Sequence, residues 1–151
     1  MYRIFVLIML YCFITISSCF AYAIDGVSLG MNRNDATEVL SKAGYRLNHH
    51  GDYNGNLQLT FTGEGVINLL LIVGADDNVI KIFKFHKKDA AYFAKKSDEL
   101  TQQFNGRTFC KGVQIITVVE TEHKEKNHEM LQLVYNSWGT ICEILFNEQI
   151  E

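Results

Sequence analysis

Residues 66–85, VINLLLIVGADDNVIKIFKF, decide the expected fold because they contain two strands and the turn that joins them. Residues 66–73 are almost wholly apolar, which favours a central strand that is covered on both faces. Residues 79–85 alternate apolar side chains with two lysines, which favours an outer strand with one face in water. The intervening GADDN has the small and polar residues of a hairpin turn. This segment therefore predicts an antiparallel sheet.

Two helices are predicted on either side of this hairpin, because apolar residues recur there at spacings of three and four. The first helix lies within residues 32–44, where Asn32 can cap the first turn and Gly44 can end the last one. The second helix begins near Asp89 and ends at Asn105. Both segments are short enough to lie across a sheet.

Further strands are predicted from alternating or continuous apolar residues over 57–62, 113–120, 129–135 and 140–146. The element order is therefore helix, three strands, helix, three strands. We predict an α+β fold in which two helices pack on one face of an antiparallel sheet. The two halves are nearly equal in length, which leaves open a doubled unit.

The N-terminus predicts export, because Arg3 is followed by an uncharged run and then by small residues that end in Ala-x-Ala at Ala23. We predict a signal peptide over residues 1–23 and a single domain over 24–151. Two alternatives stay open: lipidation of Cys19, because ISSC resembles a lipobox, or an uncleaved membrane anchor. The expected location is periplasmic or secreted, or the outer membrane if the protein is a lipoprotein.

The charge of the chain narrows the classes of partner. The net charge is −3 at pH 7, and removal of the predicted signal peptide makes it more negative because that segment contains Arg3 and no acid. An acidic chain is poorly suited to bind nucleic acid or an anionic membrane. We expect membrane contact only through a lipid on Cys19 or a retained signal peptide.

Two cysteines, Cys110 and Cys142, lie in the predicted domain, and a pair in an exported chain predicts a disulfide. In a meander their strands would lie two inter-strand spacings apart, which is too far for a bridge. The bridge therefore requires Cys110 to precede its strand, with Gly112 providing the bend. Two free thiols are the alternative.

The segment GVSLG, residues 26–30, matches the G-x-S-x-G pattern of serine hydrolases. That motif needs a strand before the serine and a helix directly after it. No strand is predicted before Ser28, and the chain is too short for such a hydrolase fold. We therefore interpret residues 26–30 as the entry to the first helix.

Residues 24–45, IDGVSLGMNRNDATEVLSKAGY, resemble the first motif of small exported bacterial domains related to the assembly lipoprotein BamE and to the β-lactamase-inhibitor-protein fold. The matching positions are Gly26, Leu29, Gly30, Met31, Asp35, Leu40 and Gly44, and Asn32 replaces the usual serine cap. BamE-like domains have one helical unit before three strands, so a doubled unit would be closer to the inhibitor. The resemblance implies binding to envelope proteins and no catalytic residues.

No pattern of catalytic or metal-binding residues is found in the sequence. His49, His50 and Asp52 fall in a polar segment, and His123 and His128 fall in another, without the spacing of a zinc site. The paired acids lie in predicted turns or at strand ends. We expect no enzyme activity, no metal and no cofactor.

The remaining class of function is recognition of another protein at the surface. We predict partner-binding residues where aromatic and polar side chains gather in expected loops. The candidates are Tyr45, His49, His50, Asp52, Tyr53 and Trp138. The predicted function is an exported, non-enzymatic envelope protein that binds another envelope or secreted protein. It would act as an adaptor or assembly factor, or as an inhibitor or immunity protein against a periplasmic hydrolase or toxin. A periplasmic protein that binds a small ligand or lipid is the alternative.

Overall fold

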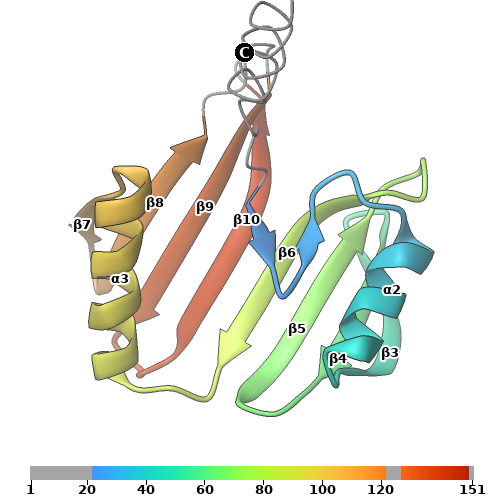
Figure 1. Ribbon diagram of the computed structural model, residues 1–151, viewed down its shortest axis with the longest axis horizontal. Coiled ribbons are helices and arrows are strands. Elements are labelled where there is room, and N and C mark those ends of the chain that lie inside the picture. Colours follow the sequence, from blue (N-terminus) through green and yellow to red (C-terminus); the bar gives the residue numbers. More distant parts are fainter. Residues whose placement is uncertain (1–21, 122–126, 150–151) are drawn as a thin grey trace, which may run out of the picture.

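The computed structural model describes residues 22–121 and 127–149, and most of these residues form β-strands. Eight strands make one antiparallel sheet in the order β3-β4-β5-β6-β10-β9-β8-β7 (Figure 1). Their bounds are β3 Arg46–Tyr53, β4 Asn56–Thr62, β5 Val66–Val73, β6 Val79–His86, β7 Arg107–Lys111, β8 Gln114–Thr121, β9 Asn127–Asn136 and β10 Ile141–Gln149. A separate hairpin consists of β1 (Ala23–Ile24) and β2 (Val27–Ser28), and the helices are α2 (Arg33–Lys42) and α3 (Ala90–Phe104).

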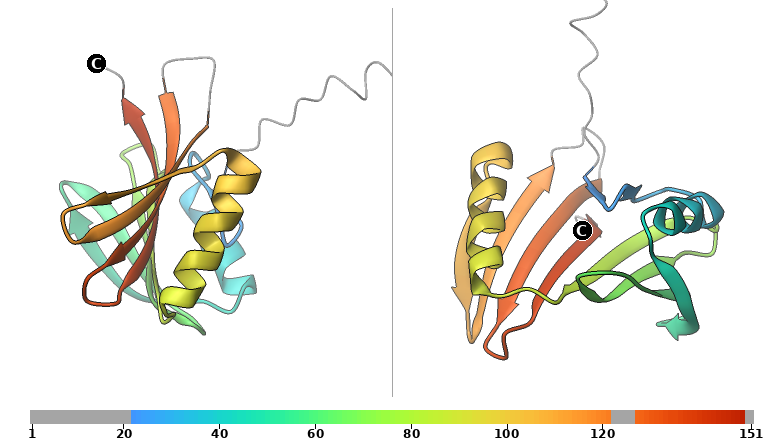
Figure 2. Two further views of the ribbon diagram at one scale, coloured as in Figure 1. Left: turned by 90° about the vertical axis from the view of Figure 1, so that its left-hand side faces the viewer. Right: turned by 60° about the horizontal axis from the view of Figure 1, so that its bottom comes forward.

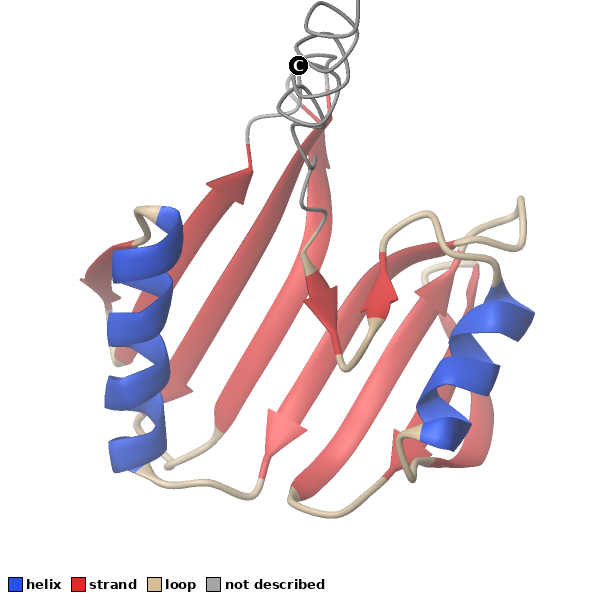
Figure 3. Ribbon diagram, viewed as in Figure 1, coloured by secondary structure: helices blue, strands red, loops and turns tan. Residues whose placement is uncertain are grey.

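This architecture overturns the predicted fold class. Of the described residues, 55% lie in strands and 21% in helices, so the α+β order of helix, three strands, helix, three strands is wrong (Figure 3). The missed strands β3 and β7 form the two edges of the sheet, where most or all of their residues are exposed. Edge strands that bury few side chains lack the apolar alternation by which strands are recognised in a sequence.

Both helices lie on the same side of the sheet, which we call the helix face (Figure 2, left). Ser97 of α3 shows the contact directly, because its hydroxyl lies 2.6 Å from the hydroxyl of Thr117 on β8 and 3.1 Å from that of Thr108 on β7. The β1–β2 hairpin lies between the two helices, in front of the middle strands (Figure 1). The opposite side of the sheet is called the open face.

The helix boundaries follow the predicted capping residues. The side chain of Asn32 accepts a hydrogen bond from the backbone N–H of Asn34 at the start of α2, and Gly44 after its end has a φ of +89°. Asp89 accepts a hydrogen bond from the N–H of Tyr92 at the start of α3, and Asn105 ends that helix in the left-handed conformation. These residues fix where each helix starts and stops on the helix face.

The main core lies between the helix face and the two helices. It joins residues from α2, α3, the β1–β2 hairpin and six strands of the large sheet. Its buried members are Ile24, Val27, Ala36, Leu40, Leu59, Phe61, Leu69, Leu71, Val73, Val79, Ile82, Phe93, Leu100, Val119, Leu131, Leu133, Ile141 and Leu145. Burial of these apolar side chains is the principal stabilisation of the fold.

The start of the described chain takes part in the fold. Ala23 pairs with Ser28 in the β1–β2 hairpin, and the Tyr22 ring contacts the Phe104 ring edge-on at 5.9 Å between centroids. The predicted boundary after Ala23 therefore falls inside β1. Cys19 lies outside the described residues. No helix in residues 22–121 and 127–149 is long and apolar enough to cross a membrane.

The predicted disulfide between Cys110 and Cys142 is wrong, because both cysteines are free. Cys110 is exposed on β7 and Cys142 is buried on β10, with β8 and β9 between them. Cys110 pairs with Ile115 of β8, whereas Cys142 is aligned, across β9, with the adjacent residue Ile116. Adjacent residues of a strand point to opposite faces, so the two thiols do as well. Three inter-strand spacings, about 14 Å, also exceed the reach of a disulfide.

Candidate functional site

The open face carries an apolar surface at its centre. In an antiparallel sheet covered on one side, the residues on the other side are normally polar. Here the register places aromatic and aliphatic side chains of β6, β9 and β10 side by side on that face. We call these residues the open-face apolar band: Phe83, Phe85, Met130, Val134, Ile144 and Phe146. Most of them are only partly buried in the described chain.

Ring contacts show how the band is organised. Phe83 stacks on Phe85 with 6.5 Å between the ring centroids, and Tyr53 approaches Phe83 to 5.9 Å. Tyr53 belongs to edge strand β3, which is separated from β6 by the two strands β4 and β5, so the sheet curls toward its open face. The ammonium group of Lys81 lies about 5 Å from the ring centroids of both Phe83 and Phe146. The band is therefore a pre-formed surface with one fixed cation in it.

Polar side chains lie around much of the band and are called its polar rim, but the apolar surface continues onto β8, where Ile116 and Val118 pack with Met130, Val134 and Phe146. On this face β4, β5 and β9 contribute the uncharged polar side chains of Gln58, Thr60, Asn68, Gln132 and Asn136. The basic residues on the face are Arg46, His49, Lys81, Arg107, Lys111 and His128, and the acids are Glu120 and Glu148. Arg107 is already paired with Glu120 at 2.7 Å. An apolar centre within a polar rim is the anatomy of a protein interface.

The structure separates the predicted partner-binding residues. Residues 46–53 form a strand and not a loop, so alternate side chains point to opposite faces. His49 and Tyr53 lie on the open face, whereas His50 and Asp52 lie on the helix-face side of the same strand. Of these four residues, His49 and Tyr53 therefore share the face of the apolar band, and Tyr53 reaches it through its contact with Phe83.

Trp138 and Tyr45, the other two candidates, have different surroundings. Trp138 is 86% exposed in the β9–β10 turn, and its backbone N–H donates to the side chain of Asn136. Because Gln114 pairs with Asn136, Trp138 lies at the same end of the sheet as the exposed Val113. Tyr45 is partly buried on the helix face, where it donates a hydrogen bond to Asp25.

A group of ionisable side chains lies at the middle of the helix face, and we call it the central polar cluster. Its members are Asp25, Tyr45, Lys84, His86, Tyr92 and Glu143. Lys84 Nζ lies 2.8 and 2.7 Å from the two carboxylate oxygens of Asp25, and the Tyr45 hydroxyl donates to Asp25 Oδ2 at 2.6 Å. The Asp25 carboxylate is therefore held by two partners.

His86 and Glu143 form the second half of the cluster. His86 Nε2 lies 2.7 Å from Glu143 Oε1, and each residue is 4% exposed. The ring N–H is not aligned with that oxygen, so the two atoms are in close contact without a well-formed hydrogen bond. The Tyr92 hydroxyl donates to the same carboxylate oxygen at 3.3 Å. Glu143 thus joins β10 to both β6 and α3.

The electrostatics of the cluster favour a charged Glu143 and protonated tyrosines. Burial raises the pKa of Glu143, but His86, Lys96 and Lys84 outweigh burial and hold the pKa below its usual value. Burial raises the pKa values of Tyr45 and Tyr92, and the neighbouring carboxylates of Asp25 and Glu143 raise them further. Both phenols therefore remain hydrogen-bond donors at neutral pH.

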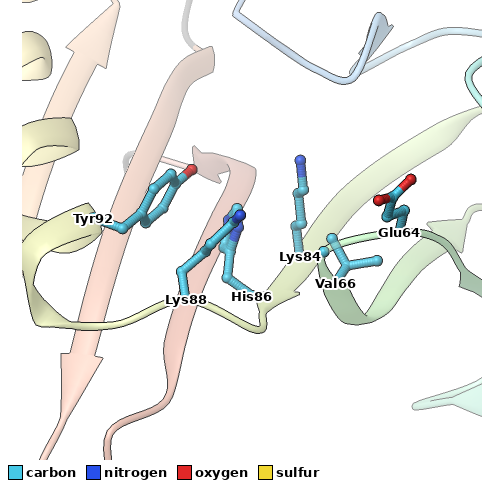
Figure 4. A pocket seen from close by; sticks show the side chains of 7 residues that line it. Glu64, Val66, Lys84, His86, Lys88 and Tyr92 are labelled. Atoms are coloured by element: carbon cyan, nitrogen blue, oxygen red, sulfur yellow. The ribbon is translucent and has the colours of Figure 1, made fainter.

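A pocket of about 520 Å³ opens beside this cluster (Figure 4). The residues that line it come from the β4–β5 turn, β5, β6, the segment after β6 and α3: Glu64, Gly65, Val66, Lys84, His86, Lys88 and Tyr92. Lys84, His86 and Tyr92 belong to both the pocket and the cluster. Within the described residues, no group of three or more His, Cys, Asp or Glu side chains is placed to hold a metal ion.

Sequence reasoning missed the central polar cluster, because its residues come from five separate segments. One signal was present in β6, where Lys84 and His86 share the alternation of the buried Ile82. A lysine and a histidine that share the face of a buried residue need hydrogen-bonding or charged partners. The partners themselves, Asp25 and Glu143, become apparent only once the strands are placed side by side.

No protein-family model, no curated protein and no solved structure matches this chain.

Proposed function

We propose that this protein is an exported, non-enzymatic binding protein that docks another envelope or secreted protein on its open face. The open-face apolar band carries the proposal, because partly exposed aromatic side chains at the centre of a sheet are costly to leave in water. A contiguous apolar surface of this kind within a polar rim is typical of interaction sites. The half-buried phenylalanines Phe83 and Phe146 are the expected anchors.

The chemistry of the face defines its partner. The rim is richer in basic than in acidic side chains although the whole chain is acidic. We therefore expect a protein with an apolar protrusion bordered by acidic residues, since complementary charges steer association and fix its register. Lys81 sits between Phe83 and Phe146, where a partner carboxylate can reach its ammonium group.

The resemblance of residues 24–45 to BamE-like and inhibitor-like exported domains supports this proposal. It favours a partner in the cell envelope and two roles, as an adaptor in assembly or as an inhibitor or immunity protein. These roles differ in the partner, which would be a component of an outer-membrane complex in the first and a hydrolase or toxin in the second. The open face serves either role.

The test compares capture by matched variants. The full chain is expressed with export, purified, and used as bait in an envelope extract, with quantitative mass spectrometry of the retained proteins. The variants are Phe83→Ser and Phe146→Ser, and the control is Ile67→Ser, which changes an exposed apolar residue outside the band. Thermal melts show that each variant is folded.

We expect the wild type and Ile67→Ser to retain one protein in stoichiometric amount. The captured amount of that protein should fall at least tenfold with either phenylalanine variant. If one anchor contributes about 2 kcal/mol to the binding free energy, its removal weakens binding roughly thirtyfold. Equal capture by all variants would place the interface elsewhere on the protein. Co-purification of lipid in place of a protein, displaced by the same variants, would favour the small-ligand or lipid alternative.

A further inference from the structure

The pocket on the helix face lies on the side of the sheet opposite to the proposed docking surface, and the proposed function leaves it without a role. It has a volume of about 520 Å³, within the range of small-molecule sites. Its inner wall is His86 and Val66, which are 4% and 3% exposed, and its outer residues are Lys88 and Glu64. The pocket therefore combines a buried floor with charged groups at its mouth.

The lining is basic in an otherwise acidic protein. Lys84, His86 and Lys88 line the pocket, with Glu64 as the acid among the lining residues. Two of these basic side chains already contact a carboxylate within the chain: Lys84 contacts Asp25, and His86 contacts Glu143. Lys88 makes no ion pair with any residue in the described ranges. Glu64 lies at the other end of the pocket from Lys88 (Figure 4).

The rest of the lining is apolar or uncharged. The Tyr92 ring lies 4.9 Å from the His86 ring between centroids, and Val66 adds an aliphatic wall. Gly65 has no side chain, and a Cβ atom placed there would lie 3.8 Å from Lys88 Nζ. The ammonium group of Lys88 therefore lies close to the glycine backbone at the pocket edge, beside apolar surface.

We propose that this pocket binds a small organic monocarboxylate. The carboxylate lies at the Lys88 end, within reach of the His86 and Tyr92 side, and the apolar body of the ligand rests on Val66 and the aliphatic stem of Lys84. One lysine without a counter-charge matches a single negative charge. A dianionic phosphate usually recruits arginines or free backbone amides, whereas no arginine is among the described residues that line this pocket and the Tyr92 amide at the start of α3 already donates to its cap, Asp89.

The test is a calorimetric titration of the purified full chain with phenylacetate, which joins a carboxylate to an apolar ring. The neutral analogue phenylacetamide and inorganic phosphate are titrated in parallel. The test variant is Lys88→Gln, which removes an exposed side chain and leaves the core intact. The matched control is Lys87→Gln, because Lys87 is an exposed neighbour that does not line the pocket.

We expect saturable binding of phenylacetate to the wild type and to Lys87→Gln, and at least tenfold weaker binding to Lys88→Gln. Phenylacetamide and phosphate should bind at least tenfold more weakly than phenylacetate to the wild type. Absence of saturable phenylacetate binding, or equal loss in both lysine variants, would overturn the proposal. Preferential binding of phosphate would overturn the monocarboxylate class.

A further variant separates this site from the docking surface. Phe83→Ser changes the open face, so phenylacetate affinity should stay within twofold of the wild type. If Phe83→Ser abolished phenylacetate binding, the ligand would lie on the open face and the pocket assignment would be wrong. Failure of the pocket proposal therefore leaves the docking proposal intact, and the reverse also holds.

Discussion

The two faces of the large sheet are both apolar at their centres, but they differ in what covers them. The helix face is covered by α2, α3 and the β1–β2 hairpin (Figure 1), and its Lys84 and His86 contact carboxylates within the chain. The open face presents phenylalanines that are only partly buried in the described chain. Apolar residues on both faces of a strand therefore need not belong to one core: those on the helix face are buried by the rest of the chain, whereas most of those in the open-face apolar band stay partly exposed.

The largest expected difference between the faces is in stability. Phe61→Ala removes a ring that is 1% exposed in the core of the helix face, and it should lower the free energy of unfolding by about 3–5 kcal/mol. Phe83→Ala removes a half-buried ring of the open face, and it should cost about 1–2 kcal/mol. Urea denaturation measures both values. Equal losses would show that the open face is part of the folding core.

A smaller loss is expected in the central polar cluster. Tyr45→Phe removes the hydrogen bond to Asp25, and hydrogen bonds to charged groups contribute about 1.5–3 kcal/mol. The pKa of Tyr45 is raised in the folded protein, so the stability of the wild type should fall as the pH rises above 10. Urea denaturation between pH 7 and 11 should show a shallower alkaline decline for the variant. An unchanged alkaline profile would contradict the assigned hydrogen bond.

The dependence of stability on pH in the acidic range tests the role of Glu143. Its pKa is depressed in the folded protein, so it adds stability above its unfolded pKa near 4.5, and this stability is lost as the pH falls below that value. Glu143→Gln should be less stable than the wild type at pH 7, and the difference should shrink between pH 5 and pH 3. The same denaturation series at low pH measures it. A constant difference would mean that Glu143 is not ionised in the fold.

The smallest effect concerns the two cysteines. Because they are free, dithiothreitol should leave the melting temperature unchanged, whereas a lost disulfide over a loop of this length would cost roughly 3 kcal/mol. Exposed Cys110 should react with iodoacetamide in the native protein. Buried Cys142, whose pKa burial raises to about 12, should react only after unfolding. Mass spectrometry of the alkylated chain distinguishes the two.

Much of the helix face was predictable because local patterns specify it. The strands predicted over 57–62 and 66–73 correspond to β4 and β5, Asn32 caps α2 as predicted, and α3 begins directly after Asp89, near which its start was predicted. Burial of one side imposes alternation, and capping residues satisfy free backbone amides whatever the tertiary context. These features are encoded within short segments.

The edges and the sites were not predictable in the same way. Strand β3 contains His49, Gly51 and Asp52, which indicate a loop, and only its backbone pairing to β4 makes it a strand. The central polar cluster needs β6 beside β10, a pairing between segments more than fifty residues apart. Which apolar residues form the open face likewise depends on that register.

The most direct test of the docking claim is methyl cross-saturation NMR of the isotope-labelled protein in complex with the partner captured by the wild type. Irradiation of the unlabelled partner should attenuate the methyl signals of Met130, Val134 and Ile144 on the open face. The methyl signals of Leu133 and Ile141, which face the helices, should keep their intensity. Attenuation confined to other surfaces, with Ile144 and Val134 unaffected, would contradict the account.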